Sequence, residues 1–377
     1  MAVTTIQSNN KLIKFTQEVN REFVRENLFS PYMGEDATSI IRRRMELKNG
    51  GEQMNIPLVT RLTGAGVSTG TLVGNEELID NYGMRVWLEW ARHAVVTNKA
   101  ESQKDSADIF GEAKPLLADW GKELQRDELI SALMALPSES QPAAGVRVNG
   151  IQYDLATVGQ RNTWNSDNSD RVVYGSVAFN ATHTTALSTL TSTTVDKLTG
   201  ANVSRMKRVA SLSNPRIRPF KTKDGYEYFV LFAGTNSFRD LKTDLATVNK
   251  DARPREQPGL QNPIFQDGDQ IYDGVIVRMV PEISTFVSNV WTNLKTSTAG
   301  SQRAEPVFLC GQQAAAFAWG QMAKPTFRSE DDYGFITGTG IEMAYGVAKM
   351  FKKHPSTGSK LVQWGTVTGF VYAPADV

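Results

Sequence analysis

The sequence has little of the residue types on which most metal and disulfide sites depend. It contains one cysteine, Cys310, which excludes an intrachain disulfide and a cysteine-rich zinc site. Cys310 ends the apolar run 306–310, so we expect a buried and unreactive thiol. The three histidines, His93, His183 and His354, lie far apart, and none has a second histidine or a cysteine at a metal-binding spacing. We expect each histidine to be a surface or packed residue.

The sequence also lacks an excess of charge of one sign and any long apolar run. Lys plus Arg number 41 and Asp plus Glu 40, whereas a dedicated nucleic-acid-binding protein normally has a basic excess. No apolar run is long enough for a transmembrane helix, and the first residues lack the basic-then-apolar order of a signal peptide. We therefore expect synthesis in the cytoplasm and no membrane partner. The 377 residues are enough for two or three soluble domains.

Three short motifs resemble sites of known chemistry but lack a part that the chemistry needs. Residues 66–70 read Gly-Val-Ser-Thr-Gly, the pattern of a nucleophile elbow, yet small and polar residues stand where a strand and a helix should flank it. Residues 338–340 match the start of a dinucleotide loop, whose third glycine is replaced by Met343. The three aspartates within 267–273 lack calcium-loop spacing and a closing glutamate. We predict no catalytic, cofactor-binding or metal-binding residues, and no enzymatic activity.

The stretch 50–136 predicts a long excursion from the body of the protein, followed by a helix. The apolar run 56–59 and the extended run 83–97 flank a loop, residues 60–74, that consists largely of glycine, threonine and serine. Because valine, tryptophan and threonine favour strands, we interpret the two runs as a hairpin arm, with an amphipathic helix as the alternative for the second run. An isolated two-stranded ribbon is marginal in water. The arm therefore needs another surface, and a second copy of the chain is the obvious one.

Two kinds of residue are candidate intersubunit contacts. In the second run of the arm, alternation places one tryptophan on each face, which predicts contact on both sides. A basic triplet follows two isoleucines, and an acidic turn near the end of the chain could pair with it across a subunit boundary. Contact with phosphate or plain exposure are the alternatives for the triplet. The candidate residues are Trp87, Trp90, Arg42, Arg43, Arg44, Glu330, Asp331 and Asp332.

The remaining pattern predicts a mixed α+β chain without internal repeats. Apolar residues at three- and four-residue steps, or runs of alanine, predict helices over 11–27, 105–136, 194–212, 238–248 and 311–322. Pro115 is expected in the first turn of the long helix. Residues 138–190 are predicted to be rich in loops, with a polar loop over 162–170. Alternation and turn residues predict strands over 172–179, 216–220, 226–233, 271–280, 307–309, 334–349 and 362–372.

In this order the parts resemble the major capsid proteins of tailed bacteriophages, which have the Hong Kong 97 type fold, and are similar to the podophage or N-four-type branch. The ordered series carries the resemblance, which covers nearly the whole chain. It runs through residues 15–23, 50–58, 71–77, 229–241, 271–277, 311–314 and 332–334. The resemblance implies an N-terminal arm (1–49), an extended β-hairpin loop (50–104), a peripheral domain (105–215) with a spine helix (105–136), an axial domain (216–300) and return strands shared by both domains (301–377).

The resemblance also implies a function. Copies of the chain would assemble as hexamers and pentamers into the icosahedral head of a virion, enclosing packaged double-stranded DNA. The implied partners are the chain itself, portal and scaffolding proteins, decoration proteins as in some members, and non-specifically bound DNA, with no cofactor. A non-viral, encapsulin-like compartment shell is the alternative. A hydrolase or a nucleic-acid-binding protein are more distant ones.

Overall fold

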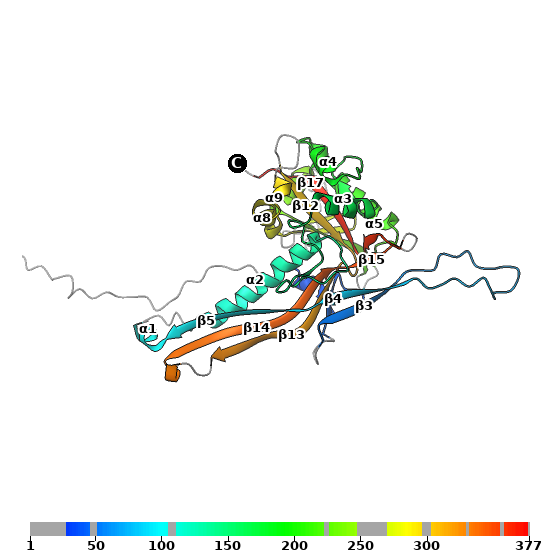
Figure 1. The fold of residues 1–377 in the computed structure, drawn as a ribbon. Coiled ribbons are helices and arrows are strands. Elements are labelled where there is room, and N and C mark those ends of the chain that lie inside the picture. Colours follow the sequence, from blue (N-terminus) through cyan, green and yellow to red (C-terminus); the bar gives the residue numbers. More distant parts are fainter. Residues whose placement is uncertain are drawn as a thin grey trace, which may run out of the picture.

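Six strands form a long sheet that leads from the body of the protein to one end of it (Figure 1). The structure is a computed structural model that describes residues 28–45, 51–104, 111–221, 226–246, 270–295, 303–328, 332–354 and 358–375. The strand order is β1-β2-β13-β14-β5, with β6 beside β14. The bounds are β1 Met33–Gly34, β2 Ile41–Arg44, β5 Glu89–Asn98, β6 Val148–Asn149, β13 Ala315–Arg328 and β14 Ile336–Lys349.

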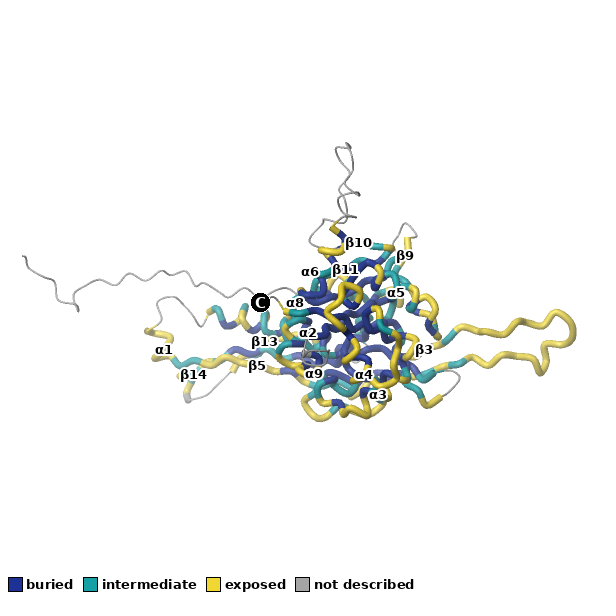
Figure 2. The backbone as a smooth tube through the Cα atoms, turned by 90° about the horizontal axis from the view of Figure 1, so that it is seen from above, coloured by how far each residue is buried: buried dark blue, intermediate teal, exposed yellow. Residues whose placement is uncertain are grey.

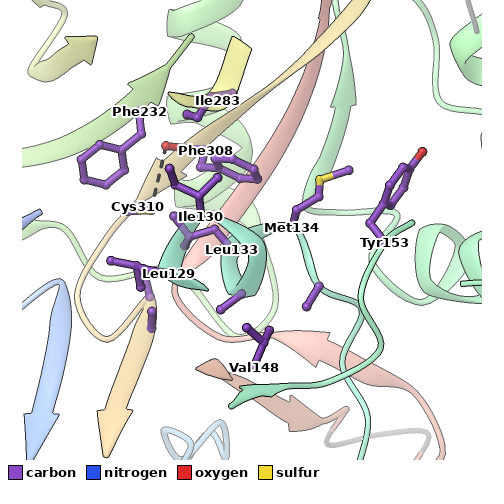
Figure 3. Packing of buried hydrophobic residues seen from close by; sticks show 14 of the residues in the cluster. Leu129, Ile130, Leu133, Met134, Val148, Tyr153, Phe232, Ile283, Phe308 and Cys310 are labelled. Carbon is purple, nitrogen blue, oxygen red and sulfur yellow. Dashed lines mark hydrogen bonds between the residues drawn. The ribbon is translucent and has the colours of Figure 1, made fainter. Parts of the chain in front are cut away.

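The helix α2 (Ala113–Met134) lies along this sheet and ends inside the body (Figure 1). Pro115 stands in its first turn, as predicted, where a missing N–H leaves no hydrogen bond unmade. The C-terminal half buries Leu129, Ile130 and Leu133. These side chains belong to the same core cluster as Phe308 of β12, close to them in Figure 3, so the end of the helix joins the long sheet to the second one.

Seven strands form the second sheet, in the order β10-β11-β9-β12-β17-β7, with β8 beside β9. Every residue of β12 and β17 is buried, so both faces of the sheet centre are covered. The edge strand β7 comes from the stretch 105–215 that the sequence analysis assigned to a peripheral domain. The bounds are β7 Val172–Tyr174, β8 Phe220–Lys221, β9 Glu227–Ala233, β10 Gln270–Tyr272, β11 Val275–Met279, β12 Ala304–Cys310 and β17 Thr366–Tyr372.

Short helices surround the second sheet and close the ends of the long one (Figure 1). Those of the body are α3 Val158–Asp167, α4 His183–Ser188, α5 Gly200–Leu212, α6 Thr235–Asp244, α8 Pro281–Asn289, α9 Thr292–Lys295 and the 3-10 turn η4 Thr194–Asp196. The remaining ones are α1 Lys99–Lys104 and the 3-10 turns η2 Ser30–Tyr32 and η6 Asp332–Gly334.

A two-stranded hairpin leaves the body on the side opposite to the end of the long sheet (Figures 1 and 2). Its strands are β3 (Gln53–Val59) and β4 (Asn81–Trp87), which pair antiparallel along their whole length. Met54, Ile56 and Leu58 alternate with exposed residues and are buried. A second small pair, β15 (Phe351–Lys353) with β16 (Leu361–Gln363), lies against the root of the hairpin.

Several predicted elements are confirmed. The pair β8–β9, the turn between β10 and β11, the buried strand β12, the long strand β14 and the last strand β17 lie where alternation and turn residues predicted strands. The helix predicted over 194–212 begins as α5 at Gly200, where the Thr199 hydroxyl accepts a hydrogen bond from the Asn202 N–H. The helix predicted over 11–27 lies outside the described residues.

The prediction of one continuous strand over 83–97 is wrong. The chain leaves β4 at Trp87 and enters β5 at Glu89, and β5 pairs with β14 instead of β3. The Leu88 N–H donates to the Glu52 carbonyl at 2.9 Å and the Trp87 N–H to the Asn149 side chain, also at 2.9 Å. The burial alternation changes phase here, because Met84 and Val86 are buried before the junction and Ala91 after it. The hairpin arm is therefore shorter than predicted.

The prediction of an alanine-rich helix over 311–322 is also wrong, because β13 occupies most of this stretch. Alanine favours helices, but its small side chain also lets a strand be covered closely on both faces. Phe317 faces the main core, whereas Ala316 and Ala318 pack under the root of the arm. Tertiary packing here overrides the local preference.

The polar loop predicted over 162–170 is mostly the helix α3. The Thr157 hydroxyl accepts from the Gln160 N–H at 3.2 Å, and the Gln160 side chain accepts from the Thr157 N–H at 2.9 Å. This reciprocal capping box starts the helix. The sequence signal was the Thr-x-x-Gln spacing, which the polar composition of the following residues concealed.

Candidate intersubunit surfaces

The loop of the arm exposes apolar side chains that no described residue of the same subunit covers. Among the described residues, Leu78 is 90% exposed, Val73 82% and Leu72 68%, and Leu62 and Ile79 are also exposed. In Figure 2 the whole loop beyond the paired strands is exposed. Soluble monomers rarely expose so many apolar side chains on one segment, and such segments mark interaction sites.

Hydrogen bonds hold the two sides of this loop together. The Glu77 carboxylate accepts from the Thr63 N–H at 2.6 Å and the Gly64 N–H at 2.7 Å, and these bonds lower the pKa of Glu77. Closer to the body, Asp80 accepts from the Thr60 hydroxyl at 2.9 Å and forms an ion pair with Lys352 of β15. The two sides of the arm are therefore held together by hydrogen bonds, while its apolar side chains remain exposed.

The root of the arm is anchored by packing as well as by charge. Met54, Ile56 and Val86 share a core cluster with Ala316 and Phe351. On the outer side, the Tyr82 hydroxyl donates to Glu139 at 2.8 Å, and Lys353 pairs with the same carboxylate at 3.0 Å. Since the root is fixed, the direction in which the arm leaves the body is fixed too.

The basic triplet lies in β2, which runs parallel to the first residues of β13. Arg43 pairs with Glu35 at 3.3 Å at the surface, and such exposed pairs add little stability. Arg42 lines a groove at the root of the arm. Of the acidic group, Glu330 and Asp331 lie outside the described residues. Asp332 begins η6, which follows the end of β13 remote from the residues that pair with β2.

The two tryptophans occupy different strands. Trp87 ends β4 and lines a small pocket with Tyr82, Arg85 and Glu139. Trp90, in β5, is 49% exposed. Because the chain changes sheets between them, they are not the two faces of one hairpin strand.

Sequence reasoning missed an apolar surface at the far end of the long sheet. The exposed residues there come from β5, β13, η6 and the residue that precedes β14: Val95, Val96, Phe327, Tyr333 and Phe335. The consecutive apolar residues 94–96 and the aromatic residues near the acidic run were the available signal. This surface and the arm lie at opposite ends of the subunit (Figure 1).

The residues considered for chemistry lie in separate places. Ser68 belongs to the exposed arm loop, with neither a strand before it nor a helix after it, and Gly338 and Gly340 are interior residues of β14. Cys310 is buried, as predicted, and burial raises the pKa of its thiol to about 12. The described part of the chain holds no cluster of three His, Cys, Asp or Glu residues that could bind a metal.

Two other residues weighed from the sequence, His183 and Asp273, have structural roles, whereas Asp267 and Asp269 lie outside the described residues. His183 is buried between the hydroxyls of Tyr153 and Tyr174, at 2.9 and 2.6 Å, and burial lowers its pKa to about 3. Asp273 turns between β10 and β11 and accepts from the Ser204 hydroxyl at 3.0 Å. None of the helices described here is both long and apolar enough to cross a membrane.

Comparisons with known proteins agree with this geometry. A family model described as phage capsid protein matches residues 3–374. The chain is similar to the cyanophage Pam1 capsid, with 32% identity, full coverage of both chains and a TM-score of 0.84. It shares the fold of the Ralstonia phage GP4 capsid (17% identity, both chains fully covered, TM-score 0.70) and of the Helicobacter pylori bacteriophage KHP30 capsid (13%, 97% and 96% covered, 0.65). No curated protein matched the chain.

Proposed function

This chain belongs to the phage capsid protein family, and we propose that its copies close as hexamers and pentamers into an icosahedral head around packaged double-stranded DNA. It is a major capsid protein with the Hong Kong 97 type fold, a structural protein of the virion that associates with itself in a capsid lattice. The compartment-shell alternative is not favoured, because the family and the similar structures are those of phage heads.

The exposed apolar loop of the arm carries the proposal. Leu72, Val73 and Leu78 have no cover within the described subunit, and the buried root fixes the arm away from the body. A second copy supplies the missing cover in this account, and an obligate interface of about 2,000 Å² or more would bury it. The arm of each subunit then lies over its neighbour in the ring.

The division of the chain that we propose is the one that the resemblance to this fold implies. Residues 1–49 belong to the N-terminal arm, 50–104 to the extended loop and the strand β5 that continues it into the long sheet, 105–215 to the peripheral domain with its spine helix, 216–300 to the axial domain, and 301–377 to the strands shared by both. Neighbouring subunits are contacted by the two tryptophans, by the basic triplet and by the acidic group: Trp87, Trp90, Arg42, Arg43, Arg44, Glu330, Asp331 and Asp332. The chain is made in the host cytoplasm and meets portal, scaffolding and, in some heads, decoration proteins. Its balanced charge limits its contact with DNA to a weak and non-specific one.

Substitutions in the arm test the proposal. Leu72→Ser with Val73→Ser should leave the subunit folded, because both side chains are exposed, and should prevent shells from forming. Leu155→Ser is the matched control, since Leu155 is 72% exposed on the body, in the turn before α3. Sedimentation and negative-stain microscopy measure the particles, and circular dichroism measures folding. Deletion of residues 60–74 should have the same effect; normal shells from either arm variant would contradict the proposal.

A further inference from the structure

The long sheet has one face on which α2 lies and a second face that points away from α2. On the first face, the centre of the Trp120 ring of α2 lies 4.8 Å from the centre of the His93 ring, and the Lys114 ammonium group lies 5.1 Å from the centre of the Phe327 ring (Figure 1). Successive residues of a strand point to opposite faces, so the neighbours of His93 in β5 belong to the second face. Residues that pair directly across strands share a face, and the registers of β5, β14 and β13 therefore assign the rest of it.

The root of the subunit's own arm covers the half of the second face that lies in the body. The hairpin β3–β4 shares a core cluster with Ala316, Ala318 and Ala348 of this face. A Cβ at Gly346 would overlap the Trp87 carbonyl oxygen, so the end of β4 lies directly on this glycine. Small side chains therefore let a two-stranded hairpin lie flat on the sheet.

The other half of the second face has no such cover among the described residues. Gly340 and Gly338 continue the line of Gly346 along β14, and a Cβ added at either of the two would meet only atoms of the neighbouring strands β5 and β13. Beside them on β5, the Trp90 and Val96 side chains are 49% and 51% exposed. We call this half the open face: the residues of β5 from Trp90 to Val96 that point away from α2, with the residues of β14 and β13 that pair with them.

The open face is basic as well as apolar. Arg92, Lys324 and Arg328 lie on it, and Glu342 lies between the first two. Glu342 accepts a hydrogen bond from the Gln321 side chain at 2.9 Å. Cations outnumber carboxylates on this surface, so a suitable occupant combines apolar side chains with a negative charge.

The loop that joins β3 to β4 has this complementary composition. Leu72 and Val73 are exposed in it, and its carboxylates, Glu76, Glu77 and Asp80, outnumber its one arginine. The loop is also part of a two-stranded hairpin, the kind of element that already lies on the same sheet face at the root. The arm leaves the body on the side opposite to the open face, so a subunit cannot cover its own open face (Figures 1 and 2).

We propose that the open face of one copy binds the loop of the arm of a second copy. The neighbour's arm then continues the layer that the subunit's own arm root begins. This contact rests on the proposed self-assembly and identifies the surface that receives the arm. Burial of leucine and valine side chains on Trp90 and Val96 stabilises it, and the opposite charges orient the arm. Because two different surfaces meet, the contact is heterologous and each copy repeats it with the next.

Two adjacent valines supply a matched pair of variants in the full-length protein. Val96 lies on the open face and Val95 on the face of α2, and both are exposed. Val96→Asp should lower the yield of shells by about tenfold or more, because it buries an unpaired charge beneath the arm. Val95→Asp should assemble like the unaltered protein. Negative-stain microscopy measures the shells, and circular dichroism checks that both variants fold.

Two results of this experiment overturn the contact. Normal shells from Val96→Asp, or an equal loss of shells from both variants, would show that the arm of a second copy does not lie on the open face. If the unaltered protein forms no particles, the proposed function itself fails, and that result is seen before any variant is made.

Photo-cross-linking in assembled shells measures the proximity directly. Lys324, exposed on the open face, is replaced by p-benzoylphenylalanine, and irradiation should give a product of two chains in which position 324 is joined to the loop between β3 and β4. The same replacement at Lys122 of α2, whose side chain is 52% exposed, is the control and should not capture that loop. Capture of the loop from both positions, or of another segment or packaged DNA from position 324, would refute the contact.

Discussion

Lys349 gives the sharpest test of how the body is held together. This residue ends β14 and is only 3% exposed, and its ammonium group has no hydrogen-bond partner within the described structure. The nitrogen lies 5.4 Å from the centre of the Trp164 ring. Burial lowers the pKa of Lys349 to about 7, and the nearby Cys310 opposes that shift slightly. We predict that Lys349→Met stabilises the subunit at neutral and acidic pH.

The size of the effect follows from linkage. Because the pKa is about 10.5 in the unfolded chain and about 7 in the fold, the folded state loses its proton first as pH rises. Below pH 7 both states are charged and the full penalty applies, about 5 kcal/mol from the pKa difference. The cation–π contact with Trp164 offsets about 1–2 kcal/mol of this. Between pH 7 and 10.5 the stability of the unaltered protein should rise by about 1.4 kcal/mol per pH unit relative to the variant.

Urea unfolding of the unassembled subunit, followed by circular dichroism at several pH values, measures the difference. Lys352→Met is the matched control, because Lys352 is equally buried but forms an ion pair with Asp80. Its removal should destabilise by about 1–3 kcal/mol, since Asp80 loses its partner. A stability difference between Lys349→Met and the unaltered protein that does not change with pH would refute the reasoning. Lower stability of Lys349→Met at every pH would do so as well.

Three further predictions concern the body and the root of the arm. His183 should reduce the free energy of unfolding by up to about 5 kcal/mol as pH falls from 6.5 to 3, because its imidazole is protonated in the unfolded chain but stays neutral in the fold. Urea titrations of His183→Gln should lack this loss of stability. Glu305→Gln should cost about 3 kcal/mol, visible as a lower melting temperature, because the buried carboxylate pairs with Arg303 at 2.9 Å. Ala316→Leu should cost about 1–3 kcal/mol by overpacking the root of the arm against Phe351, and should reduce shell formation more than Gln321→Leu at the same strand.

The sequence predicted best where one local signal decides the structure. Pro115 predicted the first turn of α2, and Gly274 predicted the turn between β10 and β11. The alternation of residue types predicted the strand β17. The arm could be predicted because a loop consisting largely of glycine, threonine and serine, residues 60–74, separates two short runs with the pattern of strands. An arm of this kind cannot bury its own side chains, so its dependence on another surface followed from composition alone.

Prediction failed where a distant contact outweighs the local pattern. No turn residue marks a break between Trp87 and Glu89, yet the chain changes from one sheet to another there. Residues up to Trp87 pair with β3, whereas residues from Glu89 pair with β14. The composition around Ala316 and Ala318 favours a helix, but in the fold these residues form a strand on which the root of the arm packs. The pocket lined by Arg61, Arg216 and Arg218 could not be predicted for the same reason, because these residues come from parts of the chain that only the fold brings together.

An electron cryo-microscopy map of particles assembled from the full-length chain would test the central claim most directly. The account predicts rings of five and six copies in which residues 60–79 of each arm lie on the neighbouring copy, with Leu72 and Leu78 covered. A particle in which these side chains remain in solvent, or in which the arm folds back on its own subunit, would contradict it.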